Sequence, residues 1–378
     1  MEVQIPAPQL HLEVAKNQHL VSQCYMREWS YNGRDSVWIY DKATRFNADH
    51  PEQSDWCITS KKTSKINSID YFYDTKAGDF YMPDEALNEL FGFLQPFSIS
   101  LNGASLDTLE KLNMNYSEFA NWEIYYDGNE VAPSDRQKIQ EYLDKSRYSY
   151  IETAWSHKYE NTWRQDISNL EQKLRTLKAT SPSGVSATTL VTADDLKNII
   201  EYMVIFDWRC LDGAWAMDNV LDTFAGIVPE IMNAPIPMST GAVTLHKEDI
   251  TIKDQFRHQL LLKYFDSLLR NNDGPLREVI DITADKLSAR FCLTDASHPF
   301  ITSDKPVYLY TRPDTFQEYV FVARPTMLIS LGRGNKSEFI VHNLSCSEVD
   351  AYNKAMANQG TTLILPSNTF PIQSLLMS

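Results

Sequence analysis

A histidine and an arginine share the segment His19-Leu20-Val21-Ser22-Gln23-Cys24-Tyr25-Met26-Arg27-Glu28-Trp29. Histidine changes its protonation near neutral pH, so His19 is a candidate acid or base. Arginine presents a planar fork of donors that matches two anionic oxygens, so Arg27 and the more distant Arg209 are candidate clamps for a phosphate or carboxylate. A structural interpretation is equally open, in which His19 caps the following helix and Arg27 pairs with an acidic neighbour.

A second segment, Phe300-Ile301-Thr302-Ser303-Asp304-Lys305-Pro306-Val307, contains polar residues that interrupt a run of strand-forming residues. Polar groups at such interruptions often carry function. Ser303 is a candidate nucleophile or anion donor, and Asp304 a candidate base, metal ligand or partner of Arg209. The alternative is a turn in which the Asp304 carboxylate accepts hydrogen bonds from backbone amides ahead of Pro306.

Other motifs fail on their spacing. The segment Gly332-Arg333-Gly334-Asn335-Lys336-Ser337 lacks the first glycine of a phosphate-binding loop, so we predict a hairpin turn there. Glu171-Gln172-Lys173 has the Glu-x-Lys form of many metal nucleases but follows a helical pattern, which predicts surface pairing. Without a His-Glu-x-x-His or Cys-x-x-Cys motif we expect no structural zinc, whereas a divalent metal cofactor stays open.

The pattern of apolar residues changes along the chain. The alternation of apolar residues predicts a strand from Ser36 to Asp41. A long helix is predicted from Ser134 towards Leu177, and a capped helix from Thr192 to Arg209. From Leu287 onwards short runs predict strands. The fold class expected is α+β, with mainly helical N-terminal two-thirds, including the long helix, packed with a mostly antiparallel C-terminal β-sheet.

The best internal boundary is the stretch of small residues, proline and glycine at 179–186. It divides the chain into an N-terminal arm, strand and helical region at 1–178 and a helical region at 179–286. The sheet region at 287–378 is expected to form one compact unit with 1–45.

Charge and hydrophobicity limit the function. With 35 Lys and Arg against 50 Asp and Glu, the 378-residue chain has a net charge of -15, which repels nucleic acid and anionic membranes. A nucleic-acid substrate would therefore need a local basic cleft. The odd number of cysteines and the lack of a long apolar segment or signal-like start predict a cytoplasmic protein without a membrane association.

Both polar segments resemble an uncharacterised bacterial family, domain of unknown function 4238. Its pattern runs His, aromatic, Val-Pro, aromatic, Leu-Arg and Phe, and later Ile-Thr-Ser-Asp-Asn-Pro-Val. Similar features recur at Val37-Trp38-Ile39-Tyr40-Asp41-Lys42, Tyr71-Phe72-Tyr73, Arg209 and Asn343. The chain departs from the family pattern at Ser22, Met26, Trp29 and Lys305.

Two hypotheses about function follow. The first is an enzyme acting on nucleic-acid or nucleotide phosphodiesters, a toxin-like or phage-defence effector, whose candidate residues are His19, Ser303 and Asp304 for catalysis and Arg27, Arg209 and Asn343 for substrate binding. The alternative is a non-catalytic sensor or protein-interaction subunit of a bacterial defence or stress operon. The abundance of Tyr and Trp motivates this alternative, because these residues are enriched at protein interfaces.

Overall fold

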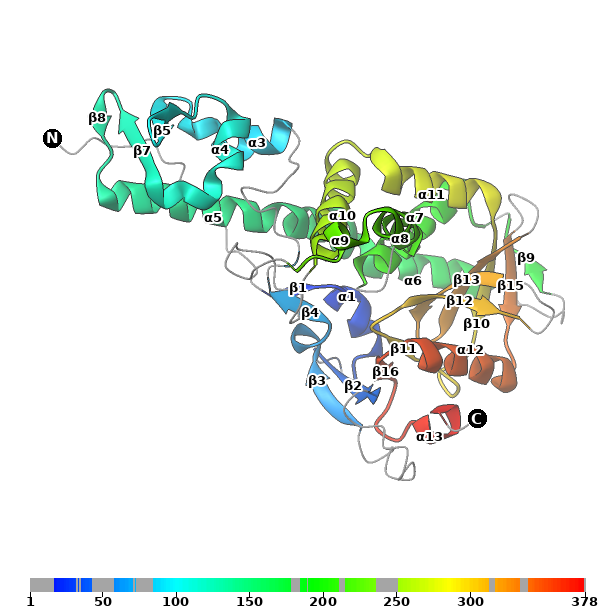
Figure 1. Ribbon diagram of the computed structural model, residues 1–378. Helices are drawn as coiled ribbons and strands as arrows, with labels where there is room; N and C mark the ends of the chain where they lie inside the picture. The colour runs from blue at the N-terminus through cyan, green and yellow to red at the C-terminus, as the bar shows by residue number, and fades with distance from the viewer. Residues whose placement is uncertain are drawn as a thin grey trace. The chain divides into compact units, whose positions relative to one another are not determined.

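The computed structural model describes residues 17–31, 33, 35–42, 58–70, 72, 84–177, 184–188, 190–210, 215–235, 251–312, 317–333 and 339–376. The chain divides into two compact units, drawn in Figure 1. Unit 1 comprises 1–18, 69–155 and 216–272, and unit 2 comprises 19–68, 156–215 and 273–378. The α+β class predicted from the sequence is confirmed.

Unit 1 combines a small antiparallel sheet with helices. The sheet has the order β6-β5-β7-β8, with bounds Ala104–Ser105, Phe97–Leu101, Trp122–Tyr126 and Asn129–Glu130. The helices in this part of the chain are α3 (Asp84–Phe91), α4 (Leu109–Met114), α5 (Pro133–Trp155), α8 (Trp215–Ile227), α9 (Pro229–Met232) and α10 (Ile252–Arg270). Alternate residues of β5 join Phe91 and Trp122 in an apolar core.

Unit 2 contains a six-stranded sheet with the order β12-β13-β14-β10-β15-β9. In that order the strands are Val307–Thr311, Gln317–Arg324, Met327–Gly332, Ser288–Leu293, Phe339–Asn343 and Val185–Ser186. Strands β10 and β15 are parallel, and the other neighbours are antiparallel. The predicted mostly antiparallel C-terminal sheet is thus present.

Helices cover both faces of this sheet. The helices of unit 2 are α1 (Gln23–Met26), α6 (Asn161–Thr176), α7 (Ala193–Arg209), α11 (Gly274–Lys286), α12 (Cys346–Gln359) and α13 (Ile372–Leu376). Of these, α6 and α7 pack on one face of the sheet and α12 on the other. On one face Phe321 of β13 packs against Trp163 of α6 and Phe206 of α7. Glu318 of the same strand points to the opposite face, because alternate residues of a strand alternate sides, and there it accepts a hydrogen bond from Tyr352 of α12.

The long helix predicted from Ser134 is interrupted. Helices α5 and α6 are separated by a π-helical turn at Ser156–Glu160, where the chain also passes from unit 1 to unit 2. Helix α7 begins with the predicted capping arrangement, in which Thr192 and Asp195 cap each other's backbone amides. Single 3-10 turns occur at Arg27–Trp29, Thr63–Lys65 and Gly92–Leu94, and a longer 3-10 segment with a kink at Glu118 spans Tyr116–Asn121.

A second sheet of unit 2 pairs strands from the N-terminal part of the sequence with strands from its C-terminal part. Its antiparallel order is β11-β16-β2-β3, with bounds Thr302–Ser303, Thr362–Leu365, Ser36–Asp41 and Thr59–Lys62. Strand β2 has the predicted bounds. The strands β1 (Asn17–His19) and β4 (Ser68–Asp70) lie at the points of the sequence where the chain changes unit.

Strands β14 and β15, which flank the segment predicted as a hairpin turn, are not neighbours in the sheet. Strand β10 lies between β14 and β15, so these consecutive strands are not paired with each other. The prediction was wrong because the local turn residues carry no information about a third strand inserted from earlier in the chain. Residues 334–338 lie outside the described part of the chain.

Candidate functional site

His19 ends β1 and is buried in unit 2. Its ring nitrogen Nδ1 lies 3.5 Å from Nε2 of Gln23, at the start of α1. Burial lowers the pKa of His19 below its ordinary value, and the charge of Arg209 lowers it further, against the opposing effects of Glu160 and of backbone groups at Thr63 and Ser64. The imidazole is therefore neutral at physiological pH and can accept a proton.

Arg209, the last residue of α7, is fully buried beside His19. Its Nη2 donates to the backbone oxygen of His19 over 2.5 Å, and its Nη1 lies 3.3 Å from Oε1 of Glu160 in the π-helical turn. The guanidinium therefore binds the chain segment that carries His19 and a protein carboxylate. This geometry gives Arg209 a positioning role.

Glu160 and Cys24 complete this cluster. Burial raises the pKa of Glu160, but the charge of Arg209 and hydrogen bonds from Ser22, Arg209 and Ser156 outweigh it and leave the pKa lowered. Burial and then Glu160 raise the pKa of the Cys24 thiol to about 12, so it is not a thiolate at neutral pH. Of the two groups, Glu160 is ionised and Cys24 is neutral.

Arg27 lies apart from this buried cluster. It forms an ion pair with Asp35, with Nε and Oδ1 separated by 2.8 Å, and the two side chains are 47% and 67% exposed. An ion pair so open to water contributes little to stability. The structure thus brings His19 and Arg209 together and leaves Arg27 at the surface.

The second polar segment lies where the chain leaves β11 and enters β12 in the other sheet. Ser303 is fully buried, and its Oγ donates to Lys305 O over 3.1 Å and accepts from Lys305 N over 3.0 Å. A Cβ atom at residue 360 would overlap the Ser303 side chain, which explains the glycine there. Ser303 therefore holds a turn against the end of α12.

Asp304 connects this turn to the start of β16. Its Oδ1 accepts from Thr361 N over 2.8 Å, while its own amide donates to Thr362 O. Burial raises the pKa of Asp304, and backbone hydrogen bonds from Thr361 and Thr362 oppose the rise. Lys42 follows the last residue of β2 and lies close enough to Asp304 for that carboxylate to raise the Lys42 pKa. Burial has the larger effect, so the pKa of Lys42 is lowered. His19 and Asp304 are thus held by different partners.

The two polar segments themselves are in contact. Tyr25 Oη donates to Val322 O over 2.7 Å and lies 2.6 Å from Thr302 Oγ1, and Trp29 Nε1 donates to Phe300 O over 2.9 Å. Phe300 and Thr302 belong to the second segment. The contact is made by the aromatic residues, which sequence analysis had not proposed as site residues.

Asn343, the remaining candidate, ends β15 and is exposed. It pairs in register with Leu293 of β10. Tyr71 and Tyr73 of the family resemblance lie outside the described residues.

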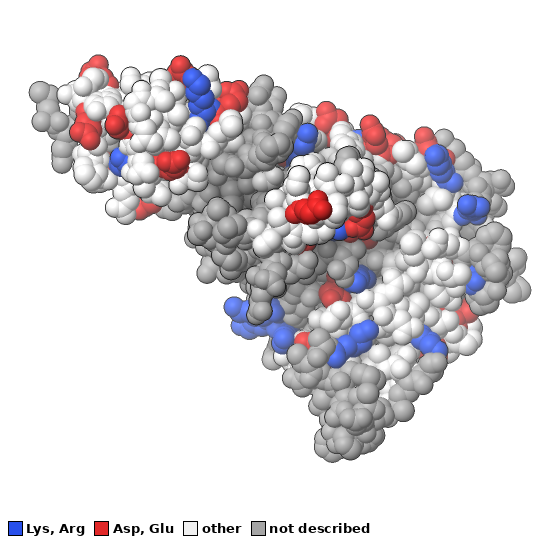
Figure 2. All heavy atoms as spheres, in the orientation of Figure 1, with Lys and Arg blue, Asp and Glu red and all other residues white. Residues whose placement is uncertain are grey.

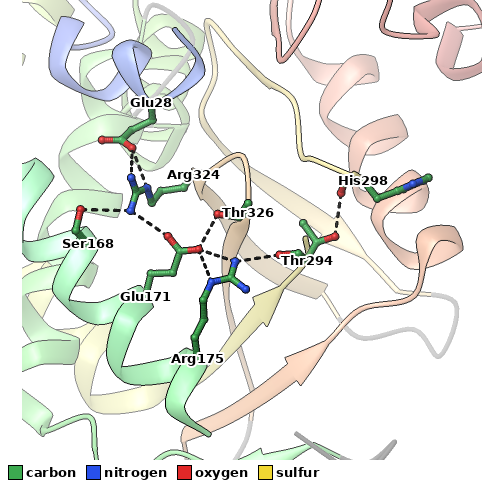
Figure 3. A network of polar contacts seen from close by, with 8 residues as sticks. All are labelled: Glu28, Ser168, Glu171, Arg175, Thr294, His298, Arg324 and Thr326. Carbon is green, nitrogen blue, oxygen red and sulfur yellow. Dashed lines mark hydrogen bonds and ion pairs between the residues drawn. The ribbon is translucent and has the colours of Figure 1, made fainter. Parts of the chain in front are cut away.

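A further ionic network, drawn in Figure 3, connects the 3-10 turn Arg27–Trp29, α6 and the β13–β14 turn. Arg324 binds Glu28 through Nε and Nη2 at 2.8 and 2.7 Å and Glu171 through Nη1 at 3.0 Å. Glu171 also accepts hydrogen bonds from Arg175 and Thr326. The predicted surface pairing of Glu171 is thus wrong, because α6 turns this residue towards the strands; helical spacing alone does not reveal which face is covered.

The stability of the protein should depend on pH through Asp207 of α7. Burial raises its pKa to about 6, and a hydrogen bond with Tyr319 opposes the rise. The folded state therefore holds this proton more tightly than the unfolded state, so the contribution of Asp207 to stability falls as pH rises from about 4 to about 6. We expect Asp207→Asn to be more stable than the wild type, with an advantage that grows by about 1 kcal/mol between pH 5 and pH 8.

Urea denaturation at the two pH values measures this difference. Asp194→Asn, in the first turn of the same helix, is the control for an Asp-to-Asn change that leaves Asp207 in place. An Asp207→Asn advantage that is the same at pH 5 and pH 8 would contradict the assignment.

Within the described residues, no group of three or more His, Cys, Asp or Glu side chains is placed to hold a metal ion. In the same part of the chain, no helix combines the length and apolar character needed to cross a membrane.

Comparison with known proteins places the chain in a family. The model of the family described as Protein of unknown function (DUF4238) matches residues 17–369. No curated protein and no solved structure matches the chain. Because the match covers nearly the whole sequence, this protein belongs to the family described as Protein of unknown function (DUF4238).

Proposed function

We propose that this protein is an enzyme that acts on phosphodiesters of nucleotides or nucleic acid, with His19 as the group that transfers a proton. The observation that carries the proposal is the burial of His19 beside the Arg209–Glu160 ion pair. A neutral imidazole held in one place can take a proton from an attacking hydroxyl or water and return it to the leaving oxygen.

The other residues have distinct roles in this proposal. Arg209 positions the backbone of His19, and the exposed Arg27 would exchange its ion pair with Asp35 for a substrate phosphate. Asp304 is the second candidate acid or base, because burial raises its pKa. Ser303, fully buried, supports the turn that holds Asp304, and the exposed Asn343 remains a candidate substrate contact.

Surface charge favours a small substrate over duplex nucleic acid. On the face drawn in Figure 2, the described basic side chains are scattered among acidic ones and form no continuous basic stripe. The net charge of -15 adds a general repulsion of polyanions. Nucleotides and short single strands are therefore the first substrates to test.

The test compares wild type with His19→Gln, which keeps a polar side chain of similar length but cannot accept a proton at neutral pH. Cleavage of a chromogenic phosphodiester, cyclic nucleotides and short RNA and DNA is measured with and without Mg²⁺ or Mn²⁺. We expect the substitution to reduce the rate by about 10²–10⁴-fold. The wild-type rate should rise with pH through an apparent pKa below the ordinary histidine value of 6.5.

Arg164→Gln, an exposed change on α6, is the control for general effects of substitution. Equal rates in wild type and His19→Gln, or no cleavage of any of these substrates by wild type, would count against the enzyme. In cells, a toxin-like or defence effector should arrest growth or degrade nucleic acid in a His19-dependent manner.

One observation favours the alternative, a protein-interaction subunit. In unit 1, Ile227 at the end of α8 and Ile231 in α9 are 69% and 59% exposed, with the exposed Val228 between them. Exposed apolar side chains close together are a feature of partner-binding surfaces. The aromatic residues that first motivated this alternative are largely buried among the described residues, including Trp122, Trp155 and Trp163.

A further inference from the structure

The face of the six-stranded sheet that bears α12 contains a polar hollow. Register places Arg290 of β10 opposite Ser330 of β14, and Ser288 opposite Gly332, so these residues share one face. Glu318 lies on the same face of β13. Together with Arg312 and Arg333 they line a hollow of about 220 Å³, which we call the arginine hollow.

Glu318 is the anchor of the arginine hollow. Its carboxylate is almost completely buried and accepts hydrogen bonds from Arg290, from Arg312 Nη1 at 3.2 Å and from Ser330 Oγ at 2.6 Å. Tyr352 of α12 donates to the same carboxylate over 3.3 Å. A single buried acid thus fixes the orientation of two guanidinium groups.

Positive charge exceeds negative charge among the described residues that line the hollow. Arg290, Arg312 and Arg333 face one carboxylate, that of Glu318. Glu348, in the first turn of α12, also interacts electrostatically with Arg312, but its carboxylate is bound to the amide and hydroxyl of Ser345. A local excess of positive charge favours the binding of an anionic ligand, which would neutralise it.

The arginines remain accessible from water. The side chains of Arg290 and Arg312 are 25% and 34% exposed, although Glu318 below them is 3% exposed. Arg333, which follows the end of β14, is exposed and makes no ion pair with a described residue. Guanidinium groups that a buried carboxylate holds in place, and that are partly exposed to water, are preorganised for an anionic ligand.

We propose that the arginine hollow binds the phosphate group of a phosphate monoester. The guanidinium fork matches two phosphate oxygens, and a dianion suits the charge excess better than a carboxylate does. A hollow of about 220 Å³ is smaller than the pockets that enclose whole drug-sized ligands, so the rest of the ligand would extend into solvent. The site is inferred independently of His19 and of catalysis.

Titration calorimetry with inorganic phosphate, using the full chain, tests the proposal. Wild type should bind phosphate saturably, and Arg333→Gln should weaken binding about fivefold by removing one charge without disturbing Glu318. The double variant Arg290→Gln with Glu318→Gln removes the anchor and one guanidinium together, which avoids an unpaired buried ion. It should weaken binding at least about tenfold. Arg164→Gln, an equal charge change on α6, should bind like wild type.

Further ligands identify the source of the phosphate. Binding of adenosine 5′-monophosphate more tightly than inorganic phosphate would support a nucleotide, and tighter binding of a phosphoserine peptide would support a phosphoprotein. The proposal is overturned if wild type shows no saturable phosphate binding. It is also overturned if acetate binds as tightly as phosphate, or if Arg333→Gln melts and binds like wild type. Should the double variant fail to fold, Arg333→Gln alone decides.

Discussion

Arg209→Ala is expected to lower the free energy of unfolding by about 3–5 kcal/mol. The guanidinium is buried, and its removal leaves the Glu160 carboxylate and the His19 carbonyl without this donor in the interior of unit 2. Arg27→Ala is the matched control. Its ion pair with Asp35 is exposed to water, so we expect a loss below about 1 kcal/mol.

Urea denaturation at neutral pH, followed by tryptophan fluorescence and circular dichroism, measures both changes. Similar losses in the two variants would show that the buried position of Arg209 has been misassigned. A second variant, Arg209→Ala with Glu160→Gln, should recover part of the stability because it removes the unpaired carboxylate.

Trp163→Ala is expected to lower the free energy of unfolding by about 3–5 kcal/mol. Trp163 of α6 is fully buried and contacts the rings of Tyr25, Tyr202, Phe206 and Phe321, with centroid separations of 5.8, 5.0, 5.4 and 5.7 Å. The indole therefore fills the space between α1, α7 and the six-stranded sheet. Its loss leaves a cavity bounded by rigid rings, which cannot collapse easily.

Trp38→Ala provides the control, since Trp38 is half-buried and stacks on Tyr31. We expect Trp38→Ala to lower the free energy of unfolding by only about 1–2 kcal/mol. Trp163→Phe should also cost less than Trp163→Ala, because Trp163 Nε1 has no hydrogen-bond partner among the described residues and a ring is retained. Equal denaturation midpoints for Trp163→Ala and Trp38→Ala would contradict the packing described.

The contact between the two family-like segments has a consequence for how their residues are interpreted. Tyr25 and Trp29 hold the first segment to Phe300 and Thr302 of the second through buried hydrogen bonds. The contact between the two segments is therefore explained by its contribution to the stability of the fold, without any role in chemistry. The ionisable residues of the same segments, His19 and Asp304, are the ones that retain a chemical interpretation.

Local signals in the sequence determined several elements. Strand β2 and helix α7 were predicted because alternation of buried residues and a capping pair act within a few residues of chain. The same signals could not predict the sheet of unit 1, whose strands β6 and β8 are two exposed residues each. Such short strands exist only because a partner strand completes their hydrogen bonds.

The environment of each candidate side chain was decided by tertiary structure alone. Arg209 reaches His19 across 190 residues of sequence, and Arg324 reaches Glu28 across 296. In both cases the sequence supplied the ionisable groups, whereas folding determined which became buried, because burial and pairing depend on the elements packed against a residue. The sequence by itself thus determined which residues can carry charge or protons, and only the packing of helices on sheets determined their partners and pKa values.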